Sequence, residues 1–326
     1  MRHLFIINPV AYAVKGELDS ITMKIHDSLR NRTSAPYEPY DIHVTRWERD
    51  AKGYIRRYAD AHPGEVLRVH SMGGSGTLFE VVNGIIGLPD AELAAYPMGR
   101  DNSFLRYFGD KMHMFESIHI QSTSDTKPFD VFRCRNNYGM LCGLVGMEAI
   151  VGRNGELLNR RRKLPADLGY FLSAVRYVFK GGRLSQKYTV TLDGETLDGD
   201  YISILIANTP CYAIDMAPAV DAHPNDGNLH IYLMRNMSRV KLLSAMKPYL
   251  SGGYKKFPGI ISYHKGSKIR ISSESTMCIS IDGETFYEDS VSYKVIPGAI
   301  KLVCPGEIDL NEIPRIFGRP GVEGGG

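Results

Sequence analysis

The sequence predicts an α/β domain with a parallel sheet, followed by a mainly antiparallel β domain. Up to about residue 120, apolar runs of strand length alternate with helix-length segments, a pattern typical of parallel sheets flanked by helices. Short strand-like runs predominate after that point. A length of 326 residues also exceeds the usual size of one core. We place the domains at residues 1–122 and 123–326, and allow for the C-terminal tail to return to the first domain.

Strands and helices alternate in the first domain. We expect strands at residues 4–7, 41–45, 66–70 and 93–99, and helices at 17–31, at 51–61 and from residue 78 onward. Apolar residues of the segment 17–31 recur at helical spacing, and His62-Pro63-Gly64 ends the second helix. Ligands of such sheets bind beyond the carboxyl ends of the strands, which is where several polar residues of this domain fall.

The second domain is predicted from short strand-like runs and two helical stretches. The expected strands are residues 117–121, 130–135, 139–143, 187–192, 202–207, 229–233, 268–271, 278–281 and 292–295, and the expected helices are 168–180 and 239–251. Asp193-Gly194 and Asp282-Gly283 are dipeptides typical of hairpin turns. No internal repeat of fixed period interrupts this pattern.

Composition indicates a globular protein of the reducing cytoplasm. The hydrophobic fraction is 43%, and the net charge of +3 is too small to indicate a nucleic-acid binder. Five cysteines without CxxC pairing suggest neither a zinc site nor a disulfide framework. No apolar run is long enough to span a bilayer, and the N-terminal run is too short for a signal peptide. We therefore expect a cytoplasmic protein.

A glycine-rich turn, Ser71-Met72-Gly73-Gly74-Ser75-Gly76-Thr77, joins the third expected strand to the helix that follows. Glycines in such a turn let backbone N–H groups point at an anion bound at the helix N-terminus. A tight crossover without a ligand explains the same residues equally well. The turn is not GxGxxG, which counts against a dinucleotide oxidoreductase, and no nucleophile elbow supports a hydrolase.

Five stretches in order resemble the diacylglycerol-kinase-like lipid kinases, which include bacterial diacylglycerol kinases, sphingosine kinases and ceramide kinases. They are Asn8-Pro9, the glycine turn with Glu80-Val81-Val82-Asn83-Gly84, Pro97-Met98-Gly99-Arg100-Asp101-Asn102-Ser103-Phe104-Leu105-Arg106, Asn225-Asp226-Gly227-Asn228-Leu229, and Ile281-Asp282-Gly283-Glu284. Each motif alone is weak, and their order gives the resemblance its weight. The match extends over nearly the whole chain.

The resemblance implies a three-layer α/β nucleotide domain and a β-sandwich lipid domain of the NAD kinase and diacylglycerol kinase type, with ATP and Mg²⁺ in the cleft between them. The residues that match the family's nucleotide-binding positions are Asn8, Thr45, Ser71, Gly73, Gly74, Ser75, Gly76, Thr77, Arg100 and Asn102. Glu284 matches the family's catalytic acid, with Asp282 as the other candidate to accept the hydroxyl proton. Asp226, with His223 and Asn228, matches a magnesium site thought to be structural. A common hairpin turn is a strong alternative explanation for Asp282-Gly283. A solvated turn explains Asp226-Gly227 about as well as a magnesium site does.

Three departures alter the expected nucleotide site. Ser75 stands where the family has an acid, Arg100 where it has a threonine, and Ser103 where it has a second acid. A later glycine cluster is replaced by Tyr212-Ala213-Ile214-Asp215. A cleft with fewer carboxylates and one more arginine is more positive, so it would hold an anion but bind Mg²⁺ less well. We hypothesise that Arg100 contacts a phosphate, the alternative being a solvated arginine at the rim.

Three functions follow from this sequence. The first is an ATP-dependent kinase for diacylglycerol or a related lipid, peripheral at the inner face of the membrane, with a homodimer left open. The second is a catalytically impaired relative that binds nucleotide or lipid as a sensor or scaffold, and the third is an NAD kinase. The basic run Arg160-Arg161-Arg162-Lys163 is either a solvated helix entrance or a contact for anionic headgroups. We expect Tyr170, Phe171, Tyr177 and Phe179 to pack in the core or between domains.

Overall fold

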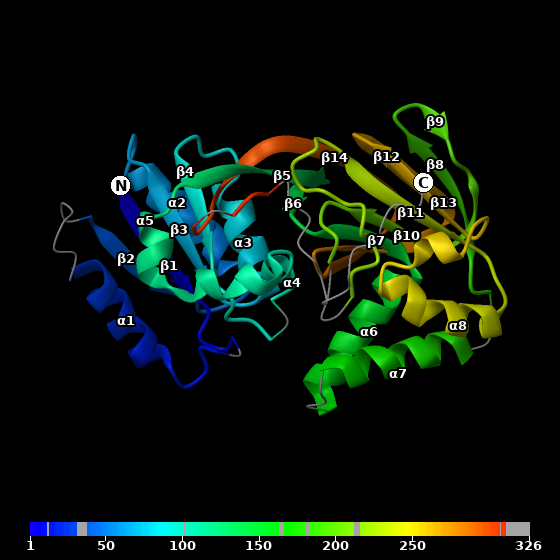
Figure 1. Ribbon diagram of the computed structural model, residues 1–326, viewed down its shortest axis with the longest axis horizontal. Coiled ribbons are helices and arrows are strands. Elements are labelled where there is room, and N and C mark those ends of the chain that lie inside the picture. Colours follow the sequence, from blue (N-terminus) through cyan, green and yellow to red (C-terminus); the bar gives the residue numbers. More distant parts are fainter. Residues whose placement is uncertain are drawn as a thin grey trace. The chain divides into compact units, whose positions relative to one another are not determined.

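The computed structural model forms two compact units (Figure 1). It describes residues 1–11, 13–30, 38–100, 102–162, 166–179, 183–211, 216–306 and 308–310, without the side chains of 160–162, 166 and 167. Unit 1 comprises Met1–Val131 and Pro297–Gly326, and unit 2 comprises Phe132–Ile296. The side chains of the basic run 160–163 and the segment 212–215 lie outside the described residues. The predicted fold class, an α/β part followed by a β-rich part, is confirmed.

Unit 1 is built on a parallel sheet with the strand order β4-β3-β1-β2. Its strands are β1 (Arg2–Ile7), β2 (Tyr40–Val44), β3 (Leu67–Met72) and β4 (Ala91–Ala95). The four residues Leu4–Ile7 are fully buried, as expected of a central strand that is covered on both faces. The far end of β14 (Glu284–Val303) adds a further parallel pairing to β4 at Lys301 and Leu302.

Helices cover both faces of this sheet. On one face α1 (Leu18–Arg30) and α5 (Ile118–Thr123) pack against β1 through a cluster that includes Phe5, Ile25 and Ile118. On the other face lie α2 (Asp50–Ala61) and α3 (Ser75–Ile85). The short α4 (Ser103–Arg106) and the 3₁₀ helix η1 (Gly109–Glu116) precede α5. The result is a three-layer unit, as the resemblance implied.

The prediction of a strand at residues 117–121 is wrong, because this segment forms the helix α5. Its alternation of isoleucine with polar residues imitates a strand, and Ile118 is indeed buried while Ile120 is exposed. The Ser117 hydroxyl, however, accepts a hydrogen bond from the Ile120 N–H at 3.2 Å. Serine in this N-cap position begins a helix, and the local cap prevails over the short alternating pattern.

Unit 2 is mainly antiparallel, as predicted. Its strands are β5 (Thr126–Cys134) and β14, both shared with unit 1, and β6 (Asn137–Gly139), β7 (Cys142–Gly146), β8 (Gln186–Leu192), β9 (Glu195–Thr196), β10 (Gly199–Ala207), β11 (Leu229–Arg235), β12 (Ile261–Gly266) and β13 (Lys268–Ile281). They follow the order β12-β11-β10-β7-β13-β14, with β8 also paired to β10 and β13. The runs 268–271 and 278–281 belong to one strand, whose register shifts between Ser272 and Met277.

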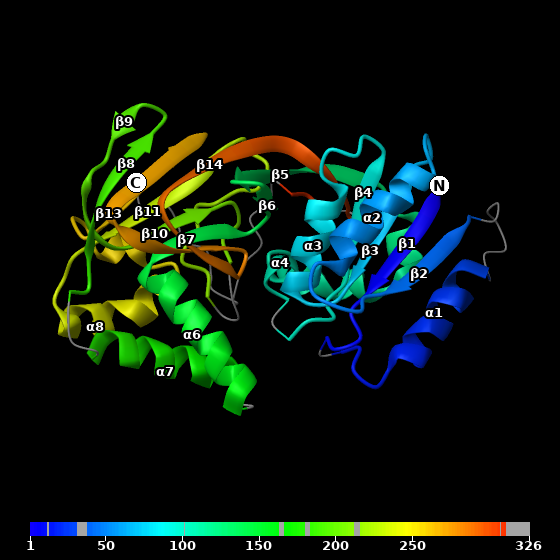
Figure 2. The same cartoon turned by 180° about the vertical axis from the view of Figure 1, so that it is seen from behind.

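Three helices pack on the sheet of unit 2: α6 (Met147–Arg162), α7 (Ala166–Phe179) and α8 (Arg239–Leu250), with the 3₁₀ turn η2 (Tyr254–Lys256) after them. Figure 2 shows α6 and α7 side by side. The helix α6 was not predicted from the sequence, because it contains glycines at 152 and 155 and its C-terminal half is polar. Phe171 and Phe179 are 63% and 68% exposed, so the expectation that they pack in the core or between domains is wrong.

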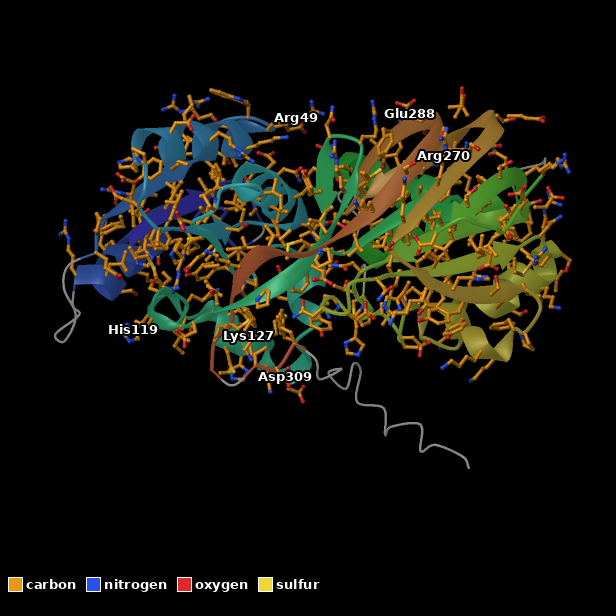
Figure 3. All side chains as sticks on the ribbon, turned by 90° about the horizontal axis from the view of Figure 1, so that it is seen from above. Arg49, His119, Lys127, Arg270, Glu288 and Asp309 are labelled. Atoms are coloured by element: carbon orange, nitrogen blue, oxygen red, sulfur yellow. The ribbon has the colours of Figure 1, made fainter. Side chains whose placement is uncertain are left out.

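The described end of the chain lies against unit 1. The Lys127 ammonium donates to the Ile308 carbonyl, and the Tyr107 hydroxyl donates to the Leu310 carbonyl at 2.7 Å. Lys127 and Asp309 accordingly appear on the same side of this unit in Figure 3. Within the described residues, none of the helices is both long and apolar enough to cross a bilayer.

Candidate functional site

The glycine turn passes directly from β3 into α3. Gly74 is the N-cap of α3, and no side chain caps this helix end. The first turn of the helix also carries no acidic residue. Backbone N–H groups at such an end are without helical partners and carry a partial positive charge. The turn therefore leads into the uncapped N-terminus of an eleven-residue helix, an end at which anions bind favourably.

A second loop packs against this turn through two glycines. A Cβ placed on Gly99 would lie 2.7 Å from the Gly74 Cα, closer than real contacts allow. A Cβ on Gly73 would lie 2.3 Å from the Thr77 hydroxyl oxygen. A Cβ on Gly76, in contrast, would meet nothing within 4 Å. Gly73 and Gly99 are thus required by packing, whereas Gly76 borders open space at the helix start.

Asn8 and Thr77 contact each other. The Asn8 side-chain amide donates to the Thr77 hydroxyl at 3.0 Å, and the Asn8 side-chain oxygen accepts from the Val10 N–H at 3.1 Å. The end of β1 is thereby fixed to the first turn of α3. Both residues match expected nucleotide positions, and the bonds here show them shaping the turn. A direct nucleotide contact by either of them stays a prediction.

The other expected nucleotide residues lie in the same unit. Asn102 has a left-handed backbone (φ 50°), and its side-chain oxygen accepts from the Gly99 N–H at 2.7 Å, which closes the second loop. Thr45 follows the end of β2, where its N–H bonds the Ile7 carbonyl. Ser71 is 2% exposed and belongs to β3, so it lies in the buried strand that precedes the turn. Arg100 is exposed. The motif residue Asp101 lies outside the described residues.

The second half of the glycine motif holds two helices together, a role that the sequence did not reveal. The Glu80 carboxylate accepts from the Arg49 and Ala51 N–H groups at 2.7 and 3.1 Å, so it caps the start of α2. A Cβ on Gly84 would lie 2.9 Å from Ile55 of α2. Arg49, at the capped end, is marked in Figure 3. These motif residues position α3 and have no need of a ligand.

Asp282 and Glu284 differ sharply in surroundings. Asp282 and Gly283 have left-handed backbones (φ 48° and 96°) and form the two-residue turn between β13 and β14. The Asp282 carboxylate accepts from the N–H groups of Met140, Leu141 and Cys142 at 2.6, 3.0 and 2.9 Å. Burial raises the pKa of Asp282 to about 6, against the lowering effect of these three donors. Glu284 begins β14 and is exposed.

The chain contains a second turn of the same construction. Asp193 and Gly194 are also left-handed, and the Asp193 carboxylate accepts from the Ser267 and Lys268 N–H groups at 2.7 and 2.9 Å. Burial acts to raise the pKa of Asp193, but these hydrogen bonds lower it overall. Both aspartates therefore serve as anchors that fix a hairpin to a neighbouring segment. Of the two acids of this motif, Asp282 is engaged by backbone N–H groups and Glu284 is exposed.

Asp226 is held by a protein cation. Its Oδ1 accepts from the Asn228 N–H at 2.9 Å, while its Oδ2 lies 2.8 Å from the Lys265 ammonium and 3.1 Å from His230 Nε2. His223 contributes a backbone N–H, 3.2 Å from the same ring nitrogen. Among the described residues, no group of three or more His, Cys, Asp and Glu side chains is arranged to hold a metal ion.

These contacts do not fit the magnesium site that the resemblance implied. Both Asp226 carboxylate oxygens are already bonded, and the Lys265 ammonium supplies the positive charge beside them. Burial acts to raise the pKa of Asp226, but Lys265 and the Asn228 N–H lower it overall, so the carboxylate is charged. Burial in turn lowers the pKa of His230, which keeps the ring neutral. The sequence did not point to Lys265, which lies on β12, far along the chain from Asp226.

Comparison with known families gives two matches that together span most of the chain. Residues 2–134 match the diacylglycerol kinase catalytic domain, and residues 144–304 match the YegS C-terminal NAD kinase beta sandwich-like domain. The first match contains the glycine turn and the Gly99 loop. The second contains Asp226, Asp282 and Glu284.

Individual relatives give the same picture. A provisionally named lipid kinase of Staphylococcus haemolyticus is 25% identical over 264 residues, covering 80% of this chain and 84% of the relative. A provisionally named lipid kinase of Staphylococcus aureus is 26% identical over 239 residues, covering 73% and 77%. Among solved structures, a provisionally named diacylglycerol kinase of Bacillus anthracis has a TM-score of 0.70 at 22% identity, covering 93% of this chain and 96% of that one. At that identity the structural likeness shows the fold alone.

Proposed function

Since the chain belongs to the diacylglycerol-kinase-like family of lipid kinases, we propose that it transfers a phosphoryl group from ATP to a hydroxyl of diacylglycerol or a related lipid. The observation that carries the proposal is the uncapped N-terminus of α3 beside the Gly99 loop. Its backbone N–H groups would bind the phosphates, and open space at Gly76 leaves room for them. Arg100 would add a cation for the phosphate charge.

Glu284 would accept the proton of the attacking hydroxyl. Asp282 would act as a positioning residue, because its three N–H bonds hold the turn from which Glu284 extends. Mg²⁺ bound to ATP would offset the phosphate charge during transfer. Ser75 offers a hydroxyl in place of the family's carboxylate, and the first turn of α3 carries no acidic residue, so we expect the protein to depend on the metal that the nucleotide brings.

The decisive experiment incubates the purified protein with labelled ATP, Mg²⁺, a panel of lipids and NAD, and compares two variants. Glu284→Gln should lower transfer to the preferred lipid about a hundredfold or more, the usual contribution of a general base, and leave ATP binding intact. Glu195→Gln is the matched control, because Glu195 follows the other Asp-Gly turn in the same way. It should retain full activity.

Two outcomes would favour other functions. Nucleotide binding without transfer to any acceptor would indicate a sensor or scaffold, a function for which the missing acid at Ser75 argues. Transfer to NAD in place of lipid would indicate an NAD kinase. Equal activity of Glu284→Gln and the wild type would remove Glu284 from the mechanism.

A further inference from the structure

The helix α7 presents four large apolar side chains to solvent. Leu168, Phe171, Leu172 and Phe179 are 42%, 63%, 41% and 68% exposed. The buried side consists of Gly169, Ser173, Ala174 and Val178. The exposed residues are spaced by three, four and seven residues and therefore lie on one helical face, which we call the α7 face. A continuous exposed apolar stripe of this kind marks an interaction site.

Close packing on α6 holds this face outward. A Cβ on Gly169 would lie 1.8 Å from the Asn159 side-chain oxygen and 2.9 Å from the Gly155 carbonyl. A Cβ on Gly155 would lie 2.4 Å from the Tyr170 ring. The two helices therefore meet through glycines, and the Tyr170 ring of α7 occupies the space that Gly155 leaves on α6. With Tyr170 packed on α6 in this way, the neighbouring Phe171 is left exposed. Figure 1 shows α6 and α7 as adjacent helices.

The surroundings of the α7 face are cationic. The sequences of α7 and α8 contain one acid, Asp167 at the start of α7, and carry the exposed cations Arg176, Arg239, Lys241 and Lys247. Arg239 Nε donates to the Val178 carbonyl at 2.9 Å, which ties the start of α8 to the end of α7. Val240 and Leu243 add exposed apolar surface on α8. In the sequence, the basic run 160–163 directly precedes α7.

We propose that the α7 face docks on an anionic lipid bilayer, with Phe171 and Phe179 entering the interface and the surrounding cations contacting headgroups. A helical face that combines large apolar residues with flanking Lys and Arg is the chemistry of interfacial membrane binding. The proposal rests on the proposed function, because a lipid kinase must reach a substrate that resides in a bilayer. A second copy of the chain fits less well, since a two-fold interface sets the same surface against itself and would bring two cationic surroundings together.

Vesicle sedimentation with the full chain tests the proposal. Vesicles of equal phosphatidylglycerol and phosphatidylcholine should bind the wild type, and vesicles of phosphatidylcholine alone should bind it weakly. Changing both Phe171 and Phe179 to Ser should reduce binding to anionic vesicles about a hundredfold, and 0.5 M salt should reduce wild-type binding as well. Met23→Ser is the control, since Met23 is 62% exposed on α1 of unit 1.

Activity on a dispersed short-chain diacylglycerol separates this proposal from the kinase function. The double variant should phosphorylate it as the wild type does and lose activity only on vesicle-borne substrate. The docking proposal would be overturned if the wild type did not bind anionic vesicles, or if the double variant bound them as the wild type does. Either result would count even if the protein phosphorylated the short-chain lipid. A dimer in sedimentation velocity that the double variant converts to monomer would assign the face to a second copy. Vesicle binding without any lipid phosphorylation would overturn only the kinase proposal.

Discussion

Ser75 is the first residue of α3, at the end of the helix where a negative charge is most favourable. An acid at this position would stabilise the helix by about 0.3–1 kcal/mol. The same acid would repel phosphate groups bound to the N–H groups beside it unless a metal ion lay between them. In the proposed phosphate site, this residue would therefore determine how strongly phosphate binding depends on Mg²⁺.

Ser75→Asp should raise the midpoint of thermal unfolding and make ATP binding more dependent on metal. Calorimetric titration should show weaker ATP binding than in the wild type when EDTA is present, and recovery in excess Mg²⁺. Ser75→Asn is the control, because it has the same size as the aspartate without the charge. Equal metal dependence of the two variants would contradict this electrostatic role. A gain of transfer activity in Ser75→Asp would show that the missing acid limits the reaction.

The loop before β11 is the element in which structure and resemblance differ most. Lys265 of β12 contributes the charge that neutralises Asp226, so an ion pair ties the loop to the strand β12, which pairs with β11. The Lys265 side chain is 45% exposed and that of Asp226 is 24% exposed, which places the pair between the surface and buried limits. Because Lys265 supplies the positive charge at Asp226, the stability of the folded protein should be insensitive to divalent metal.

Lys265→Met should lower the free energy of unfolding by about 0.5–1 kcal/mol, because it leaves the Asp226 charge without its cation. Added Mg²⁺ should stabilise this variant, whereas neither Mg²⁺ nor EDTA should shift the wild type, as measured by thermal unfolding without nucleotide. Lys255→Met is the control: its pair with Asp221 is 3.2 Å long, and the lysine is 71% exposed. A wild type that EDTA destabilises would contradict the ion-pair account.

The same loop predicts a pH dependence. The pKa of Asp226 is lowered in the folded protein, since Lys265 and the Asn228 N–H outweigh the opposing effect of burial. The carboxylate thus contributes stability above its unfolded value of 3.8, and this contribution is lost as the pH falls through the lower folded value. Urea unfolding between pH 6 and pH 3 should show a smaller loss of stability on acidification in Lys265→Met than in the wild type. An identical loss would show that Lys265 does not set this pKa.

At the scale of the whole molecule, the two proposed ligands should affect different units. A non-hydrolysable ATP analogue should protect the amides of residues 73–78 and the Gly99 loop of unit 1 from hydrogen exchange. Anionic vesicles should instead protect residues 168–179 of unit 2. Exchange measured by mass spectrometry with each ligand alone checks both expectations. Protection of the same peptides by both ligands would contradict the assignment of separate surfaces.

Much of the fold could be predicted because its signals are local. The buried strand at Leu4–Ile7, the stripe of α1 and the break at His62-Pro63-Gly64 each follow from residues close together in the chain. The helices α5 and α6 could not be predicted, each for a different reason. A short alternating pattern concealed the serine cap of α5, and α6 packs through glycines that a search for apolar periodicity passes over.

The sequence by itself determined the order of the two parts, the glycine turn between strand and helix, and the succession of motifs that indicates the family. Only the tertiary structure decided what the polar residues of those motifs bind. Asp282 is engaged by three backbone N–H groups, Glu80 caps a neighbouring helix, and Asp226 pairs with a lysine from another strand. The reason is physical: a hydrogen bond or ion pair depends on distances of about 3 Å between groups that the chain brings together only on folding.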